Sequence, residues 1–200
     1  MKFWLLIVLF FLLGCSVNQG SDSRHLAAAL ELKNSTNKTT DPAALAPSDL
    51  ATLNAPVIHV RVPKTGVSFF ATEIQAKNDL QIFRSKAGHS LTVRKGNLIA
   101  TRGFGFDLLA KARDQGFVYH FADGNHQQKT LRVRCERSGP IPDQLVIAGT
   151  KFTVFRWVSD CDNDEHSFKN TYWQSKQGRV WKSREWVGPQ IGHIEITRLN

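Results

Sequence analysis

Motifs that mark well-known enzyme classes are missing from this 200-residue sequence. It has no zinc-protease motif of two histidines and a glutamate, no Gly-x-Ser-x-Gly nucleophile elbow and no phosphate-binding glycine loop. The GFGF segment at Gly103–Phe106 lacks the third glycine of a dinucleotide site, and the loop Asp162–His166 lacks the glycine and closing glutamate of a calcium loop. The histidines show no ligand spacing. We therefore expect no metal and no cofactor, and we favour a non-enzymatic protein, although the paired carboxylates of glycosidases can be distant in sequence.

Long apolar runs are also scarce. The run from Phe3 to Leu13 follows Lys2 and has about half of the roughly 20 residues that span a bilayer, so it fits a secretion signal. It ends in Leu-Leu-Gly-Cys at Cys15, which resembles a bacterial lipobox, where a peptidase cuts before the cysteine and the thiol is acylated. The alternative is an ordinary signal peptide or short anchor with an incidental cysteine. We expect residues 1–14 to be removed and Cys15 to carry the lipid.

The residue after the cysteine bears on the destination of the lipoprotein. Ser16 stands where an aspartate would favour retention in the inner membrane. We therefore expect the protein to be anchored in the outer membrane and to face the periplasm. Several acyl chains, at about 0.8 kcal/mol per buried CH₂, make such an anchor effectively permanent.

Aromatic residues are absent between Ser16 and Pro56, where Ala, Ser, Thr, Asn and Asp dominate. The one periodic piece, Arg24–Lys33, could form a short helix. We interpret residues 15–56 as the acylated cysteine with a flexible tether, and residues 57–200 as a single β-rich domain.

Cysteine is rare, with three in the chain. If Cys15 is acylated, Cys135 and Cys161 remain in an oxidising compartment, where a disulfide between them is the default. The loop it closes, about 26 residues, corresponds to roughly 3 kcal/mol in the chain-entropy model. The alternative is two separately buried thiols.

Acidic residues are outnumbered, and the formal net charge is +9. A basic surface implies acidic partners, and the compartment decides which of them are available. Outside the cytoplasm there is little nucleic acid, so we expect no nucleic-acid partner.

Alternating polar and apolar residues are abundant after Val57. VIHVRV at Val57–Val62 alternates, Lys95-Gly96 and Ala148-Gly149 each lie between two such runs, and Cys135 falls on an inward position. We count roughly ten short strands, which predicts an all-β antiparallel meander forming a barrel, half-barrel or sandwich. The segment Phe106–Ala112 breaks the pattern, and we expect one or two short helical turns there.

The segment Lys169–Pro189 predicts a hairpin rich in tryptophan and basic residues. A three-residue loop places Trp173 opposite Trp181, whereas a four-residue loop pairs Tyr172 with Trp181. Aromatic rings beside cations suit acidic sugars, but indoles can equally fill the core while cations line a solvated edge. We favour the structural role for the indoles. The residues that could bind a glycan or a partner are Tyr172, Trp173, Arg179, Trp181, Lys182, Arg184 and Trp186.

Four stretches of this chain resemble the YjbF/GfcB-type outer-membrane lipoproteins, which are associated with exopolysaccharide and group 4 capsule genes. They are the lipobox at Cys15 and the segments Val93–Leu109, Leu145–Val158 and Asn170–Pro189. The segment before Val57 carries no useful resemblance. The resemblance implies an all-β body and a role in making or exporting a surface polysaccharide, and it brings no catalytic residues.

From the lipobox, the basic hairpin and the resemblance we expect a non-enzymatic accessory factor in exopolysaccharide or capsule production or secretion. Its partners would be the membrane, through Cys15, and either an acidic polysaccharide or an outer-membrane export protein. The alternatives are a periplasmic polysaccharide-modifying enzyme and an envelope carrier of lipids or lipoproteins with an apolar interior.

Overall fold

The strands follow the alternation of apolar and polar residues that begins at Val57. The structure is a computed structural model that describes residues 48, 53–114, 116–122, 125 and 127–200. The sheet has twelve strands. They are β1 (Val57–Val62), β2 (Val67–Lys77), β3 (Leu80–Arg84), β4 (Ser90–Arg94), β5 (Asn97–Arg102), β6 (Asp107–Arg113), β7 (Phe117–Ala122), β8 (Gln128–Ile147), β9 (Thr150–Asp162), β10 (Ser167–Gln174), β11 (Val180–Trp186) and β12 (His193–Arg198).

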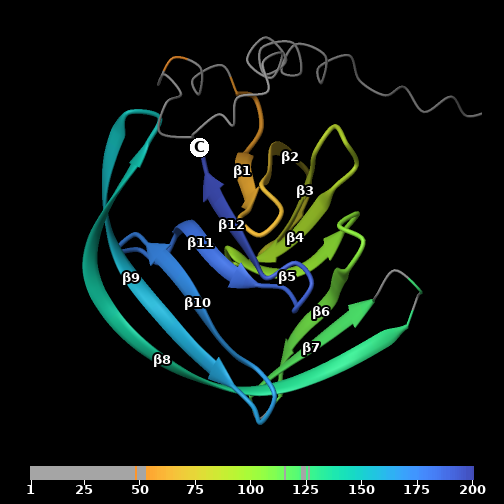
Figure 1. Cartoon of the computed structure of the whole chain (residues 1–200). Helices are drawn as coiled ribbons and strands as arrows, with labels where there is room; N and C mark the ends of the chain where they lie inside the picture. Colours follow the sequence, from red (N-terminus) through yellow and green to blue (C-terminus); the bar gives the residue numbers. More distant parts are fainter. Residues whose placement is uncertain (1–47, 49–52, 115, 123–124, 126) are drawn as a thin grey trace, which may run out of the picture.

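The twelve strands form one antiparallel meander that winds into a nearly closed barrel (Figure 1). Strands that are neighbours in sequence pair with each other, except β5 and β6, and β1 also pairs with β12. The order is therefore β5-β4-β3-β2-β1-β12-β11-β10-β9-β8-β7-β6. The two edge strands, β5 and β6, follow each other in the chain. The all-β antiparallel prediction is confirmed, and of its three forms the barrel is the one observed.

Two hairpin turns lie where the sequence predicted them. Lys95 and Gly96 join β4 to β5 with φ angles of 50° and 76°, and Ala148 and Gly149 join β8 to β9 with φ angles of 49° and 73°. Positive φ at both central residues is the geometry of the turn that matches the twist of two paired strands. Glycine at the second position accepts this geometry without strain.

The helical turns expected at Phe106–Ala112 are wrong, because Asp107–Arg113 is strand β6. The Asp107 carboxylate accepts hydrogen bonds from the backbone N–H groups of Gly103 and Phe104, at 3.0 and 3.3 Å, and so holds the turn that precedes the strand. Pairing with β7 then fixes the extended conformation. Of the described residues, Ser48 alone is helical, and the helix expected at Arg24–Lys33 lies outside them.

The larger apolar cluster fills the barrel. Its fully buried members include Val60, Phe83, Leu91, Leu98 and Ile194. A disulfide joins Cys135 to Cys161 in this cluster; the two residues are directly opposite each other on β8 and β9, with a Cα–Cα distance of 4.0 Å. The inward position predicted for Cys135 is thus observed.

A second cluster lies outside the barrel, where the tip of the β8–β9 hairpin packs against the sheet. Val57, Ile147, Ala148 and Leu199 are buried there. Because Val57 precedes the inward-facing Ile58, it belongs to the outer side of β1. His59, predicted on the polar side of β1, is 5% exposed, and its ring centroid lies 5.1 Å from that of Phe70, which packs against this cluster.

Candidate functional site

The hairpin formed by β10 and β11 has a register that the sequence did not predict. Trp173 pairs with Lys182 and Tyr172 with Ser183, and the register shifts before Gln174 pairs with Val180. Trp181 is therefore the extra residue of a β-bulge, and neither of the two predicted pairings of Trp181 occurs. The bulge lets the indole of Trp181 reach the second cluster, where its ring centroid is 4.5 Å from that of Phe152.

The seven binding residues predicted on this hairpin do not form one site. Tyr172 and Trp186 are buried in the barrel, and Trp181 packs in the second cluster. Arg179 lies over the Trp181 ring, at 4.2 Å from its centroid, and its guanidinium donates to the Asn200 carbonyl at 2.6 Å. The others, Trp173, Lys182 and Arg184, face the outside of the sheet.

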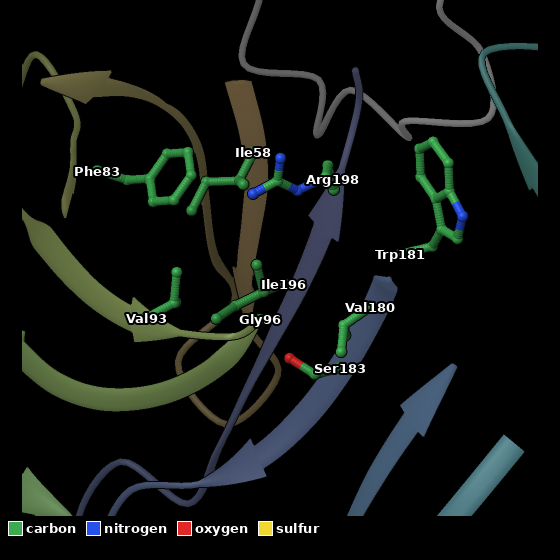
Figure 2. Close-up of a pocket in the computed structure, with 9 residues that line it drawn as sticks. All are labelled: Ile58, Phe83, Val93, Gly96, Val180, Trp181, Ser183, Ile196 and Arg198. Carbon is green, nitrogen blue, oxygen red and sulfur yellow. The ribbon is translucent and has the colours of Figure 1, made fainter. Parts of the chain in front are cut away.

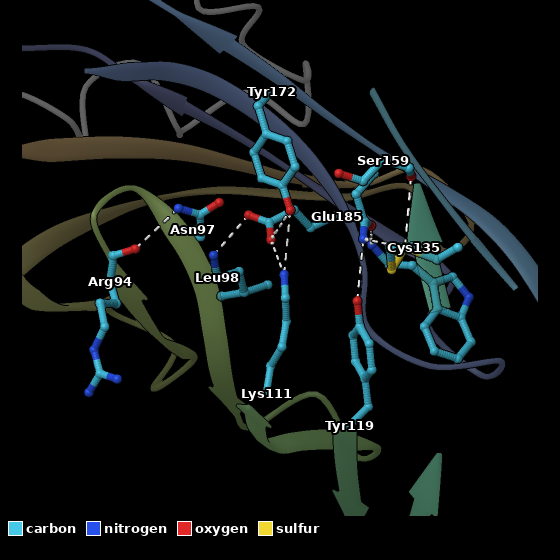
Figure 3. Close-up of polar contacts among 12 residues, drawn as sticks. Arg94, Asn97, Leu98, Lys111, Tyr119, Cys135, Ser159, Tyr172 and Glu185 are labelled. Carbon is cyan, nitrogen blue, oxygen red and sulfur yellow. Dashed lines mark hydrogen bonds and ion pairs between the residues drawn. A yellow bond between two sulfur atoms is a disulfide. The ribbon is translucent and has the colours of Figure 1, made fainter. Parts of the chain in front are cut away.

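The buried part of the hairpin is organised by Glu185 on β11, a residue that the sequence analysis missed (Figure 3). Its carboxylate is 1% exposed and forms an ion pair of 2.7 Å with the Lys111 ammonium. The Tyr172 hydroxyl donates to the same oxygen at 3.0 Å, and the backbone N–H of Leu98 donates to the other oxygen at 2.8 Å. We call Lys111, Tyr172, Glu185 and the Leu98 amide the inner network.

The inner network keeps its amine charged and its phenol neutral. Burial, the largest single influence, disfavours the charged form of Lys111. The Glu185 carboxylate, together with smaller contributions from Tyr172 and Tyr119, outweighs burial, and the pKa of the amine is raised. Burial, followed by the Glu185 charge, raises the pKa of Tyr172. Tyr172 is therefore a hydrogen-bond donor at neutral pH.

The inner network links both edges of the sheet to its middle. Leu98 lies on edge strand β5 and Lys111 on edge strand β6, whereas Glu185 lies on β11, far from both edges in the strand order. β5 also approaches β11 closely, because a Cβ on Gly96 would lie 2.6 Å from the Cβ of Val180. One carboxylate thus joins both edge strands to β11 through the barrel interior, in addition to the direct hydrogen bonds of Thr101 on β5 with Asp107 and Leu108 on β6.

Trp186 belongs to an aromatic cluster beside the inner network. Its ring stacks on Phe168, with 4.2 Å between centroids, and meets Tyr119 edge-on at 5.8 Å. Asn170 fixes the group, because its side-chain oxygen accepts from the Trp186 backbone N–H at 2.7 Å and its amide donates to the Tyr119 hydroxyl at 3.3 Å. Trp186 is therefore a core residue, as the structural interpretation of the hairpin expected.

A small cavity lies among the described residues of the barrel interior. It has a volume of ≈ 20 Å³ and lies between Phe83, Val93, Ile196 and Arg198 on one side and Val180 on the other (Figure 2). That volume holds about one water molecule.

The outer side of the hairpin carries a different arrangement, centred on Trp173. Its indole N–H donates to the Asp143 carboxylate at 2.9 Å, and the Lys182 ammonium lies 5.3 Å from its ring centroid. Arg156 lies 3.4 Å from the same carboxylate. The Trp173 hydrogen bond is the main reason that the pKa of Asp143 is lowered.

Two residues along β11 from Lys182, Arg184 shares a carboxylate with a second arginine. Glu195 on β12 forms ion pairs with Arg61 on β1, at 3.6 Å, and with Arg184 on β11, at 3.7 Å. The three residues are directly opposite one another across β1, β12 and β11. Both arginine side chains are about half exposed, at 52% and 49%.

These outer residues form what we call the basic face. Its four cations are matched by two carboxylates, so the face keeps an excess of positive charge. Its members are Arg61, Asp143, Arg156, Trp173, Lys182, Arg184 and Glu195.

The acidic segment Asp162–His166 ends β9 and forms the turn to β10 at Asn163–His166, as the polar loop predicted from the sequence. The Asn163 side-chain oxygen accepts from the backbone N–H groups of Glu165 and His166, at 3.1 and 2.7 Å. In the described part of the chain, no group of three His, Cys, Asp or Glu residues is arranged to hold a metal ion. Residues 48, 53–114, 116–122, 125 and 127–200 also contain no helix long and apolar enough to cross a membrane. The predicted lipidation site, Cys15, lies outside the described residues.

Comparison with known proteins gives a family. A family model described as group 4 capsule polysaccharide lipoprotein gfcB, YjbF matches residues 24–199. The match begins within the segment in which the sequence analysis found no useful resemblance. Among solved structures, the hypothetical lipoprotein YmcC from Escherichia coli has the same fold, with a TM-score of 0.71 and 18% identity over 87% of this chain and 93% of that one. No curated protein matches. The chain belongs to the group 4 capsule polysaccharide lipoprotein family.

Proposed function

We propose that this protein is a non-enzymatic accessory factor in the production or secretion of a capsule-type polysaccharide. In this proposal Cys15 carries the lipid, the protein faces the periplasm from the outer membrane, and residues 15–56 tether the β-body that starts at Val57. Family membership is the observation that carries the proposal. The basic face supports it, because it presents positive charge to the solvent rather than to the protein interior.

The packed interior disfavours the carrier alternative. A lipid chain would need a dry channel, whereas Phe83, Leu91 and Leu98 are fully buried in the barrel and the cavity beside Phe83 is ≈ 20 Å³. A carried lipid would have to displace these core side chains, each of which contributes about 1.5–3 kcal/mol by its burial.

The inner network also argues against a catalytic role for Lys111 and Tyr172. Tyr172 and Lys111 have raised pKa values, a property often found at active sites. Their polar atoms, however, bind Glu185 and each other inside the core. We therefore assign them to the architecture of the barrel.

Deleting the gene in its native host tests the proposal. We expect less surface and secreted polysaccharide under capsule-inducing conditions, with recovery when the wild-type gene is returned. The variant Cys15→Ser should lose membrane attachment, measured by fractionation and by incorporation of labelled palmitate, and should restore polysaccharide less well. Unchanged polysaccharide after deletion would show that the proposed role is wrong.

A further inference from the structure

Resting on the proposed function, we propose that the basic face is a binding site for polysaccharides that carry carboxylate groups. The arginines and Lys182 would pair with the sugar carboxylates, and the Trp173 ring would pack against a sugar ring.

The sheet fixes the spacing of the cations on this face. Lys182 and Arg184 are two residues apart on β11 and therefore point to the same side, about 7 Å apart along the strand. Arg61 is displaced from Arg184 by two strands, because Glu195 lies between them. The cations thus form a two-dimensional array on a rigid support, which suits a ligand with charges repeated along a chain.

The ion pairs on this face can exchange their partners. The exposed Arg61 and Arg184 share one carboxylate, Glu195, at distances of 3.6 and 3.7 Å. Exposed pairs of this kind contribute about 0–1 kcal/mol, so an arginine loses little when it turns to another carboxylate. The guanidinium can then bind a sugar carboxylate through two hydrogen bonds.

Trp173 adds a preference for sugars. Its indole N–H is bound to Asp143, so the ring has a fixed orientation beside Lys182. An aromatic ring packs well against the C–H face of a sugar, and the neighbouring cation is placed to meet a carboxylate on the same residue. A simple array of cations would lack this selectivity.

The composition of the face favours a charged glycan over a protein partner. The cores of protein interfaces are depleted in charged residues overall, although arginine is enriched there, and they usually contain several aromatic anchors. The basic face has six charged residues around one indole. A protein partner is therefore an outcome for the test to detect.

Binding to defined polymers tests the inference, with the protein purified from membranes in a non-ionic detergent. The probe is polygalacturonate, compared with its methyl ester, which keeps the sugar and removes the charge, and with polyglutamate, which keeps carboxylates and removes the sugar. We expect polygalacturonate to bind most tightly at about 0.05 M salt and to weaken at about 0.5 M. No binding of polygalacturonate, or equal binding of polyglutamate, would overturn the inference.

Variants locate the site. Lys182→Ala with Arg184→Ala should weaken polygalacturonate binding about tenfold or more, since each loses a charge-assisted contact. Trp173→Ala should weaken binding of polygalacturonate but not of polyglutamate. The matched control removes two exposed cations at the start of β8, Lys129→Ala with Arg132→Ala, and should leave binding unchanged. Circular dichroism checks that each variant is folded.

Two results separate this inference from the proposed function. If deletion lowers polysaccharide but the Lys182→Ala, Arg184→Ala variant binds polygalacturonate like wild type, the inference is wrong and the proposed function stands. If that variant fails to restore polysaccharide while it still binds the polymer, the basic face serves a protein partner. Normal polysaccharide after deletion contradicts the proposed function itself.

Discussion

Two carboxylates on neighbouring strands, Glu185 and Glu195, each hold two or more donors, yet they lie on opposite sides of the sheet. Glu185 is 1% exposed and binds the Lys111 amine, the Tyr172 hydroxyl and the Leu98 amide. The Glu195 side chain is 21% exposed and lies between two arginines. Glu195 pairs directly with Arg184, the residue before Glu185, so the alternation of one strand separates the two environments.

The difference teaches how position in the sheet decides what a charged group does. In the interior, removal of one partner leaves a buried charge without compensation, at a cost of about 3–5 kcal/mol. On the surface, water replaces a lost partner, and the cost is about 0–1 kcal/mol. The inner network is thus suited to hold the barrel closed, and the basic face to exchange partners with a ligand.

The largest expected effect is on the inner network. Lys111→Met keeps the side-chain volume but removes the charge that faces Glu185, so the free energy of unfolding should fall by about 3–5 kcal/mol. Urea unfolding followed by tryptophan fluorescence measures the change. The control Lys129→Met removes an exposed amine and should change stability by less than about 0.5 kcal/mol. Equal stability of both variants would show that the Lys111 charge does not stabilise the fold through Glu185. The contrast between the buried Glu185 and the exposed Glu195 would then be wrong.

The disulfide provides an uncharged link of similar strength within the barrel. Cys135 and Cys161 are 26 residues apart, and the chain-entropy model assigns about 3–4 kcal/mol to a loop of that length. Replacing both cysteines with alanine should lower the free energy of unfolding by about this amount. Combination with Lys111→Met should be additive if the two links act independently. A shortfall of more than about 1 kcal/mol from additivity would mean that they stabilise the same unit.

The fold was predictable to the extent that it depends on local pattern. Strict alternation and the pairs Lys95-Gly96 and Ala148-Gly149 predict strands and tight turns from a few residues each. The segment Phe106–Ala112 was misjudged because its composition suits helix as well as strand. Its strand conformation depends on pairing with β7 and on the contacts of Asp107 with the preceding turn.

The site was less predictable, because its contacts join distant residues. Glu185 binds Lys111 and the Leu98 amide, which are 74 and 87 residues away in the chain. An acid at an inward position of β11 was the available signal, and it could not reveal its partners. Trp181, the bulge residue, likewise packs against Phe152 in another hairpin. The register of β10 and β11 therefore could not be predicted from the sequence of that hairpin alone.

Alkaline titration tests whether the hydroxyl of Tyr172 is buried in the inner network. The chain has two tyrosines, and burial raises the pKa of both Tyr119 and Tyr172. The unfolded chain loses these protons near pH 10, so their contribution to stability is complete below that pH and is lost as the pH rises toward the folded values. Absorbance of tyrosinate should therefore appear together with the loss of tryptophan fluorescence. In urea, where the chain is unfolded, both should titrate near pH 10. A reversible titration near that pH in the folded protein would contradict the burial of these hydroxyls.

The smallest expected effect belongs to the pair of Arg184 and Glu195 on the basic face. Arg184→Ala should lower the free energy of unfolding by less than about 1 kcal/mol, because both side chains remain hydrated and Glu195 keeps Arg61 as a partner. A double-mutant cycle of Arg184→Ala and Glu195→Gln, measured by urea unfolding, isolates the coupling between them, and we expect at most about 0.5 kcal/mol, decreasing with added salt. A coupling above about 2 kcal/mol would place Glu195 in the same class as Glu185. It would also remove the physical basis for partner exchange on the basic face, since an arginine held that strongly would not turn to a sugar carboxylate.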